Sequence, residues 1–159
     1  GNLRATADLV IDTSHRSIHE LRRAIDAAFE SDEPVRLRAT VMSFGFKYGL
    51  PMDADYVADV RFIPNPHWIP ELRHLRGIDA PVNDYVVAQE GAVRFLDTYA
   101  KLIDLATAGY LREGKRFATI AIGCTGGKHR SVAMAENLSA RLVHVGLEVS
   151  VIHRDLGRE

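Results

Sequence analysis

The densest group of residues with chemical potential follows an apolar run near the end of the chain. Residues 117–122 are typical of a buried strand, the pair Gly126-Gly127 follows it, and helical spacing begins at Ser131. Loop amides and the first turn of a helix converge at such a junction, where the helix dipole adds partial positive charge. The pattern predicts a phosphate-binding loop, with Thr125, Gly126, Gly127, Lys128, His129, Arg130 and Ser131 as its residues.

The same loop has a second interpretation as a catalytic site. Cys124 and Arg130 show the C-x5-R spacing of cysteine-dependent phosphatases, whose thiolate lies in an amide-lined cradle while the guanidinium grips two phosphate oxygens. However, Gly123 stands where that class usually has histidine, and no loop with a catalytic aspartate can be assigned. Cys124 is therefore either a nucleophile or a small buried residue at the strand end.

Nucleotide hydrolysis and a structural metal are not predicted for this chain. Gly126-Gly127-Lys128 resembles part of a P-loop, but that motif requires Ser or Thr where His129 stands. Among the histidines, only His15 and His19 have helical i, i+4 spacing, and no acidic third ligand accompanies them. We expect no metal and no cofactor in this chain.

A second candidate group follows the strand predicted at residues 56–63. Pro64-Asn65-Pro66 fixes an extended exit from that strand and holds His67 at its end, where ligands bind in open α/β sheets. Lys47, in the loop at residues 43–51, is either a ligand contact or a surface charge. Arg73, His74 and Arg76 form a solvated loop or a patch for RNA or phosphate.

The elements that must position these residues alternate between strand and helix patterns. We expect strands at residues 35–44, 56–63, 117–122 and 147–152, a long helix at 83–109 and another from 131 to about 145. This order predicts an α/β fold with a mostly parallel sheet flanked by helices.

Before these elements, residues 7–13 predict a strand, and a helix with a capping box follows at Ser17. This unit either ends a preceding domain or packs on the main one. We divide the chain into residues 1–33, a terminal strand-helix segment with a linker, and residues 34–159, a ligand-binding domain.

Composition places the chain among ordinary globular domains. It has 159 residues, of which 47% are hydrophobic and 26% charged, and its net charge of −1 provides no global field for nucleic acid. One cysteine, no apolar run long enough to cross a bilayer and no signal pattern at the N-terminus favour a cytoplasmic protein with no membrane contact.

The chain contains five motifs, in this order, at residues 43–51, 53–56, 59–68, 77–79 and 120–132. Together they resemble the C-terminal domain of the RapZ family, also called the YvcJ-like nucleotide-binding proteins. The resemblance covers about residues 35–156, while residues 7–29 look like the end of the family's N-terminal domain, whose Walker A motif is absent here.

The resemblance implies a bacterial cytoplasmic protein whose missing N-terminal P-loop domain binds ATP or GTP. It implies a C-terminal domain similar to a phosphofructokinase subdomain, which self-associates into a homo-oligomer and binds both a sugar phosphate and RNA. Enterobacterial members sense glucosamine-6-phosphate and present a small regulatory RNA to an endoribonuclease. Carried over by motif, the contacts are His67 and the glycine-rich loop, with Asp59, Arg61 and Lys47 in addition.

The chain departs from the enterobacterial pattern at its end. Those proteins finish with a lysine- and arginine-rich tail implicated in RNA binding, whereas residues 153–159 are near neutral, so phosphate contacts from this tail are not predicted. Our leading hypothesis is a non-catalytic regulatory domain. A metabolite's phosphate would bind Arg130 and the amides of Gly126 and Gly127, with its sugar hydroxyls at His67 and Asp59. The phosphatase and the RNA-binding module are the alternatives.

Overall fold

The structure is a computed structural model that describes Glu20, Arg23 and residues 34–158. The strand predicted at residues 7–13, most of the helix after it and the linker up to residue 33 lie outside the described residues. The domain boundary predicted there stays a prediction.

The described strands form one parallel sheet. Its strands are β1 (Arg38–Gly45), β2 (Tyr56–Asp59), β3 (Phe117–Cys124) and β4 (Glu148–His153), in the order β2-β3-β1-β4. Every pairing is parallel, which confirms the predicted fold class.

The strand predicted at residues 56–63 is shorter than expected. Val60 N still donates to Gly123 O at 2.9 Å, but Ile63 N then donates to Val60 O at 3.2 Å, so the backbone turns there instead of extending. Arg61 and Phe62 therefore lie in a turn at the sheet's end, not on a strand.

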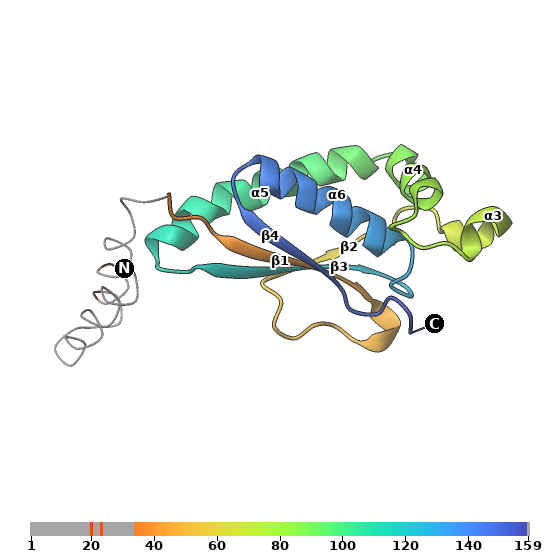
Figure 1. Cartoon of the computed structure of the whole chain (residues 1–159), viewed down its shortest axis with the longest axis horizontal. Coiled ribbons are helices and arrows are strands. Elements are labelled where there is room, and N and C mark those ends of the chain that lie inside the picture. Colours follow the sequence, from red (N-terminus) through yellow and green to blue (C-terminus); the bar gives the residue numbers. More distant parts are fainter. Residues whose placement is uncertain (1–19, 21–22, 24–33, 159) are drawn as a thin grey trace, which may run out of the picture.

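The helices lie over one face of the sheet (Figure 1). The longest are α5 (Ala92–Arg112) and α6 (Arg130–His144); α6 packs against β1, β3 and β4, while α5 packs on α6. The segment between β1 and β2, including the short helix η2 (Phe46–Tyr48), runs below the sheet in this view. The remaining short elements are α4 (Ala80–Ala88), η3 (Pro66–Trp68) and α3 (Pro70–Arg73).

The single helix predicted at residues 83–109 is wrong, because two helices, α4 and α5, occupy this region. Gln89 leaves the helical conformation with ψ 149°, and Gly91 has φ +83°, a left-handed backbone that glycine adopts without steric cost. The apolar spacing continues across the break, so periodicity alone could not reveal it. α4 starts earlier than predicted, with Pro81 in its first turn, where proline is well tolerated.

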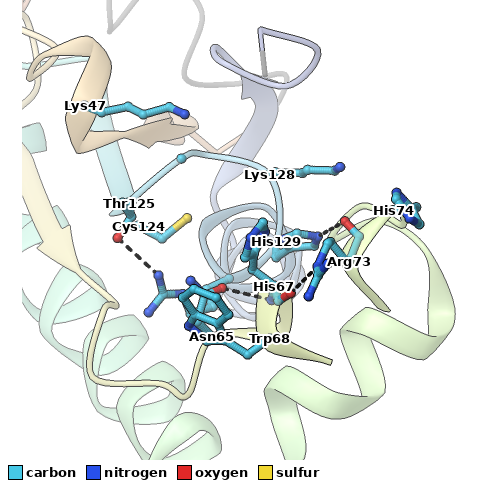
Figure 2. Close-up of a pocket in the computed structure, with 12 residues that line it drawn as sticks. Lys47, Asn65, His67, Trp68, Arg73, His74, Cys124, Thr125, Lys128 and His129 are labelled. Atoms are coloured by element: carbon cyan, nitrogen blue, oxygen red, sulfur yellow. Dashed lines mark hydrogen bonds between the residues drawn. The ribbon is translucent and has the colours of Figure 1, made fainter. Parts of the chain in front are cut away.

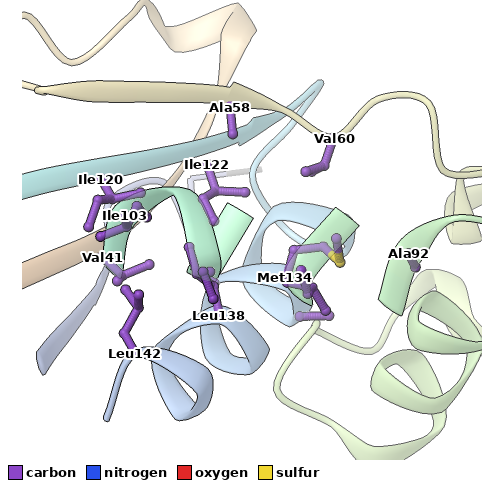
Figure 3. Packing of buried hydrophobic residues seen from close by; sticks show 14 of the residues in the cluster. Val41, Ala58, Val60, Ala92, Ile103, Ile120, Ile122, Met134, Leu138 and Leu142 are labelled. Carbon is purple, nitrogen blue, oxygen red and sulfur yellow. The ribbon is translucent and has the colours of Figure 1, made fainter. Parts of the chain in front are cut away.

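A fully buried apolar core joins the sheet to these helices (Figure 3). Val41 of β1, together with Ile120 and Ile122 of β3, belongs to one cluster with Leu138 and Leu142 of α6. Interiors of this kind are close-packed, so their elements resist displacement. The core thus gives the loops at the strand ends a rigid base.

The register brings the carboxyl ends of three strands to one edge. Gly45 of β1 lies opposite Cys124 of β3, and Asp59 of β2 lies opposite Gly123. In open parallel sheets this edge is where ligands bind.

Candidate functional site

A cavity of about 370 Å³ opens at this edge of the sheet (Figure 2). Its wall is built from η2, the segment around η3 and α3, and the loop between β3 and α6. Its twelve lining residues are Lys47, Asn65, His67, Trp68, Arg73, His74, Cys124, Thr125, Gly126, Lys128, His129 and Arg130.

The lining carries charge of one sign. Lys47, Arg73, Lys128 and Arg130 are permanent cations at neutral pH, and none of the twelve lining residues is acidic. Within residues 34–158, none of these four side chains forms an ion pair. Such a cavity concentrates positive potential and favours an anion.

The loop after β3 presents main-chain donors beside these cations. In the described part of the chain, the amides of Gly126, Gly127 and Lys128 have no hydrogen-bond partner. Gly127 has φ +75°, and a Cβ on Gly45 would lie 2.5 Å from the carbonyl carbon of Gly126. The glycines therefore let the loop lie directly on the end of β1, in a shape with unpaired amides at a helix start.

Arg130 is the most constrained cation of the cavity. Its side chain is only 5% exposed, and Nη1 donates to the carbonyls of Arg61 (3.2 Å) and Ile63 (3.0 Å). Nη2 donates to Thr125 Oγ1 at 3.3 Å, while buried Nε has no partner. One end of the guanidinium thus holds the turn after β2, and the edge formed by Nε and Nη2 keeps unused donor capacity.

Cys124 lines the same cavity, with its thiol close to α6. The side chain is buried, and Sγ donates to Ser131 Oγ at 3.1 Å. Ser131 is itself fully buried and does not line the cavity, so its hydroxyl contacts the Cys124 thiol and not a molecule bound in the cavity. Gly123 is explained by packing, since a Cβ there would lie 2.5 Å from the Phe44 ring.

The proline-flanked turn presents His67 to the cavity, across from Lys47 and Lys128 (Figure 2). Asn65 Oδ1 accepts the His67 amide at 3.1 Å, and Arg73 Nε donates to the His67 carbonyl at 2.8 Å. These bonds fix the backbone and leave the imidazole ring free to meet a ligand. Trp68, whose ring packs edge-on to His67, remains 74% exposed at the rim.

His129 holds the cavity wall together from inside. It is 5% exposed, and Nε2 lies 3.1 Å from the Arg73 carbonyl. Burial lowers its pKa below the ordinary value, against the opposing effect of its hydrogen bonds to the Arg73 and Leu75 backbone; the nearby charge of Lys128 lowers it further. His129 is therefore a neutral connection between the segment after α3 and the start of α6.

Asp59 and Arg61 lie outside the cavity lining. Their side chains pair with each other through bonds of 2.9 and 2.8 Å, and the Arg61 guanidinium lies 4.0 Å from the centre of the Phe46 ring. The hydrogen bond from Arg61 is the main cause that lowers the pKa of Asp59. The structure thus brings the Arg61 carbonyl, but neither charged side chain, to the site.

The other predicted residues divide between the lining and its support. Arg73 and His74 line the cavity. Arg76 lies outside the lining, with its Nε atom 3.7 Å from Asp79 Oδ2. Gly127 supports the loop without lining the cavity. Sequence reasoning missed Asn65 and Trp68 as lining residues, although both lie within two residues of His67 in the same motif.

The described residues contain neither a cluster of metal ligands nor a membrane-spanning helix. No group of three or more histidine, cysteine, aspartate or glutamate side chains in residues 34–158 could hold a metal ion. Nor does this part of the chain contain a helix with the length and apolar character needed to span a bilayer.

Comparison with known proteins decides the family. Residues 37–157 match the family model of the RapZ C-terminal domain. The chain belongs to the RapZ family. This confirms the resemblance found in its motifs and assigns the chain to the C-terminal part of RapZ-like proteins.

Relatives agree with this assignment. Three nucleotide-binding proteins each align with 99% of this RapZ-family chain: that of Streptomyces coelicolor is 63% identical over 157 residues, that of Rhodococcus erythropolis 63% over 158, and that of Thermobifida fusca 58% over 158. The alignments cover 52%, 53% and 54% of those proteins. The chain therefore spans about half the length of the curated relatives it matches.

Proposed function

We propose that this RapZ-family domain is a non-catalytic regulatory module that binds a phosphorylated metabolite, specifically an amino-sugar phosphate such as glucosamine-6-phosphate. The observation that carries the proposal is a cavity lined by four cations and no acid, beside loop amides that lack partners within the described residues. A volume of about 370 Å³ suits a small ligand.

The phosphate would lie against the loop between β3 and α6. The amides of Gly126 and Lys128 and the free edge of Arg130 would provide fixed donors, while the side chains of Lys47 and Lys128 add flexible charges. Because Nη1 of Arg130 is already held by two carbonyls, the guanidinium needs little further ordering when the anion binds.

The sugar would extend toward the opposite wall. The imidazole of His67 and the side-chain amide of Asn65 can hydrogen-bond to hydroxyl groups, and the exposed Trp68 ring offers an apolar surface at the rim. Asp59, which we expected to meet a sugar hydroxyl, is engaged by Arg61, so we assign the sugar side to His67 and Asn65.

Calorimetric titration tests this proposal directly. We expect glucosamine-6-phosphate to bind, glucosamine not to bind, and the Lys47→Ala/Lys128→Ala double variant to bind about tenfold or more weakly, since hydrogen bonds to charged groups contribute about 1.5–3 kcal/mol each. Lys101→Ala, which removes an exposed lysine of α5, is the matched control and should bind as the unchanged chain does. If glucosamine-6-phosphate gives no heat, or glucosamine gives the same heat, the proposal is wrong.

Transmission of ligand occupancy is a further part of the proposal. By family membership, a nucleotide-binding domain in the rest of the full-length protein would bind ATP or GTP and respond to the ligand, in a cytoplasmic homo-oligomer. A small regulatory RNA and an endoribonuclease are the proposed partners, with Arg73 and His74 at the cavity and Arg76 nearby as RNA contacts. A gel-shift series at rising salt should lose the complex steeply, and Arg73→Ala/Arg76→Ala should reduce that salt dependence.

A cysteine-dependent phosphatase is the second candidate, because Cys124 and Arg130 line one cavity. The cavity lining contains no carboxylate that could protonate a leaving group, which favours binding over hydrolysis. Hydrolysis of p-nitrophenyl phosphate decides between them. Activity that is lost in Cys124→Ser, while the variant still binds phosphate, would establish the enzyme and overturn the non-catalytic assignment.

A further inference from the structure

The segment that follows β4 carries a buried carboxylate. Asp155 is 0% exposed, and its oxygens accept from three directions: the Gly45 amide at 2.8 Å, Arg154 at 2.8 and 3.1 Å, and Arg158 at 2.9 Å. A carboxylate is buried only when such donors compensate for its lost hydration. Asp155 is therefore held in place by hydrogen bonds from three residues.

Asp155 accepts a hydrogen bond from the end of β1, where the loop between β3 and α6 packs on that strand. A Cβ on Gly127 would lie 3.1 Å from Asp155 Cβ and 2.8 Å from Gly45 N, so the three residues are in contact. The Gly45 amide, which donates to Asp155, thus lies directly beneath the loop with unpaired amides. A shift of Asp155 would therefore move Gly45, on which that loop packs.

The same segment also fastens the part of the chain that carries Lys47. Arg154 Nη2 donates to the Gly49 carbonyl at 2.6 Å, and Tyr48 Oη donates to the Arg158 carbonyl at 3.1 Å. The Arg158 guanidinium also lies 4.3 Å from the centre of the Tyr48 ring. Arg154 and Arg158 therefore hold Tyr48 and Gly49, the two residues that directly follow Lys47.

We infer that Asp155 is a positioning residue for the anion cavity: through Gly45 it sets the loop between β3 and α6, and through Arg154 and Arg158 it sets the helix that carries Lys47. As a consequence, order in residues 154–158 and occupancy of the cavity are thermodynamically coupled. The coupling to a ligand rests on the proposed function, whereas the positioning of the two segments does not.

Hydrogen–deuterium exchange tests the positioning without any ligand. In Asp155→Asn we expect exchange in residues 44–50 and 124–129 to rise about tenfold or more, while peptides of residues 117–122 in the core stay unchanged. Asp97→Asn, which breaks an exposed pair with Arg141 on α5 and α6, is the control and should leave both segments unchanged. Unchanged exchange in both site segments of a folded Asp155→Asn would overturn the inference.

A milder variant covers the case in which Asp155→Asn does not fold. Arg158 is 53% exposed, so Arg158→Ala removes one arm of the network without leaving a cavity in the core. The variant should stay folded with a lowered melting temperature, because Asp155 keeps its bonds to Gly45 and Arg154. Exchange in residues 44–50 should rise more than in residues 117–122, and Arg158→Lys should restore most of the protection. Equal exchange in Arg158→Ala and the original chain would contradict the inference.

Titration with glucosamine-6-phosphate then tests the coupling. Asp155→Asn, or Arg158→Ala in its place, should bind about fivefold or more weakly, the lower end of the range for coupled sites. The loss should be smaller when Lys47→Ala is already present, because part of the effect runs through Lys47. Altered exchange together with no binding by the original chain would reject the proposed function but support the positioning. Binding that is unchanged in a variant with altered exchange would overturn the coupling.

Discussion

The two ends of the sheet treat their charges differently. At the amino end, Arg38 Nε lies 3.1 Å from Glu148, and Lys115 Nζ lies 3.1 Å from Asp55, so the cations have carboxylate partners. At the carboxyl end, Asp59 pairs with Arg61, and Asp155 pairs with Arg154 and Arg158. The cavity cations Lys47, Lys128 and Arg130, by contrast, have no carboxylate partner in the described part of the chain.

This difference supports the proposed anion site. A bound anion would supply the counter-charge that these lining cations lack. The charges at the amino end are paired within the fold, so we expect substitutions at the two ends to have different consequences for binding.

Arg130→Ala should have the largest effect. It removes the most buried of the four cavity cations and leaves the Arg61 and Ile63 carbonyls without their donor, so we expect glucosamine-6-phosphate binding to disappear and the free energy of unfolding to fall by about 3 kcal/mol. Calorimetric titration and urea unfolding measure the two losses. Intact binding in the folded variant would remove the contrast between the sheet ends.

Gly127→Ala should be next, because it combines backbone strain with crowding. Its Cβ would meet Gly45 N at 2.8 Å at a φ of +75°, and we expect a loss of about 2–4 kcal/mol in unfolding free energy together with weaker binding.

Gly146→Ala is the matched control for Gly127→Ala. Gly146 has φ +104°, but a Cβ there would meet nothing within 4 Å, so strain alone should cost about 1–2 kcal/mol and leave binding unchanged. Equal losses in the two variants, measured by urea unfolding, would show that the loop is not packed on β1.

Protonation of His129 should make the stability of the fold depend on pH. Its pKa is lowered in the folded state, chiefly by burial, so the unfolded chain binds the proton more readily. The part of the unfolding free energy that depends on this pKa difference is fully present above pH 6.5. It is lost as the pH falls from 6.5 toward the lower pKa of the folded state, and the free energy changes by at most about 1.4 kcal/mol per pH unit. Urea unfolding between pH 5 and 8 should show this slope, and His129→Asn should flatten it.

Arg38→Ala should have the smallest effect. Its pair with Glu148 is exposed on both sides (66% and 50%), and such surface pairs contribute about 0–1 kcal/mol. We expect unfolding free energy to change by less than about 1 kcal/mol and ligand affinity not at all. A tenfold loss of affinity in this variant would show that the two ends are not independent.

The parts of the fold that the sequence predicted are those with a local pattern. The buried run of β3, the glycine turn and the apolar stripe of α6 adjoin one another, so the strand, the loop and the helix could be located from their residues alone. Asn65 likewise forms its hydrogen bond within its own turn, and the flanking prolines indicated in the sequence that the strand ends before His67.

The parts that were missed depend on residues far apart in the chain or on competing short-range geometry. Asp155 and Gly45 are 110 residues apart, and no periodicity links them. Alternation over residues 56–63 places Asp59 and Arg61 on one face of a strand, but it does not show that β2 ends at Asp59 or that the two side chains pair with each other outside the cavity. The helix break before Gly91 was missed because the apolar spacing continues through it.

The central place of β3 has a consequence for synthesis on the ribosome. Among the described strands, β2 pairs only with β3, and β1 pairs only with β3 and β4, so neither early strand has a neighbour until residues 117–124 have emerged. Until then apolar side chains such as Val41 and Phe44 are without their cover and prone to aggregate. Nascent chains that end before β3 should therefore bind chaperones, and those that extend past β4 should be released.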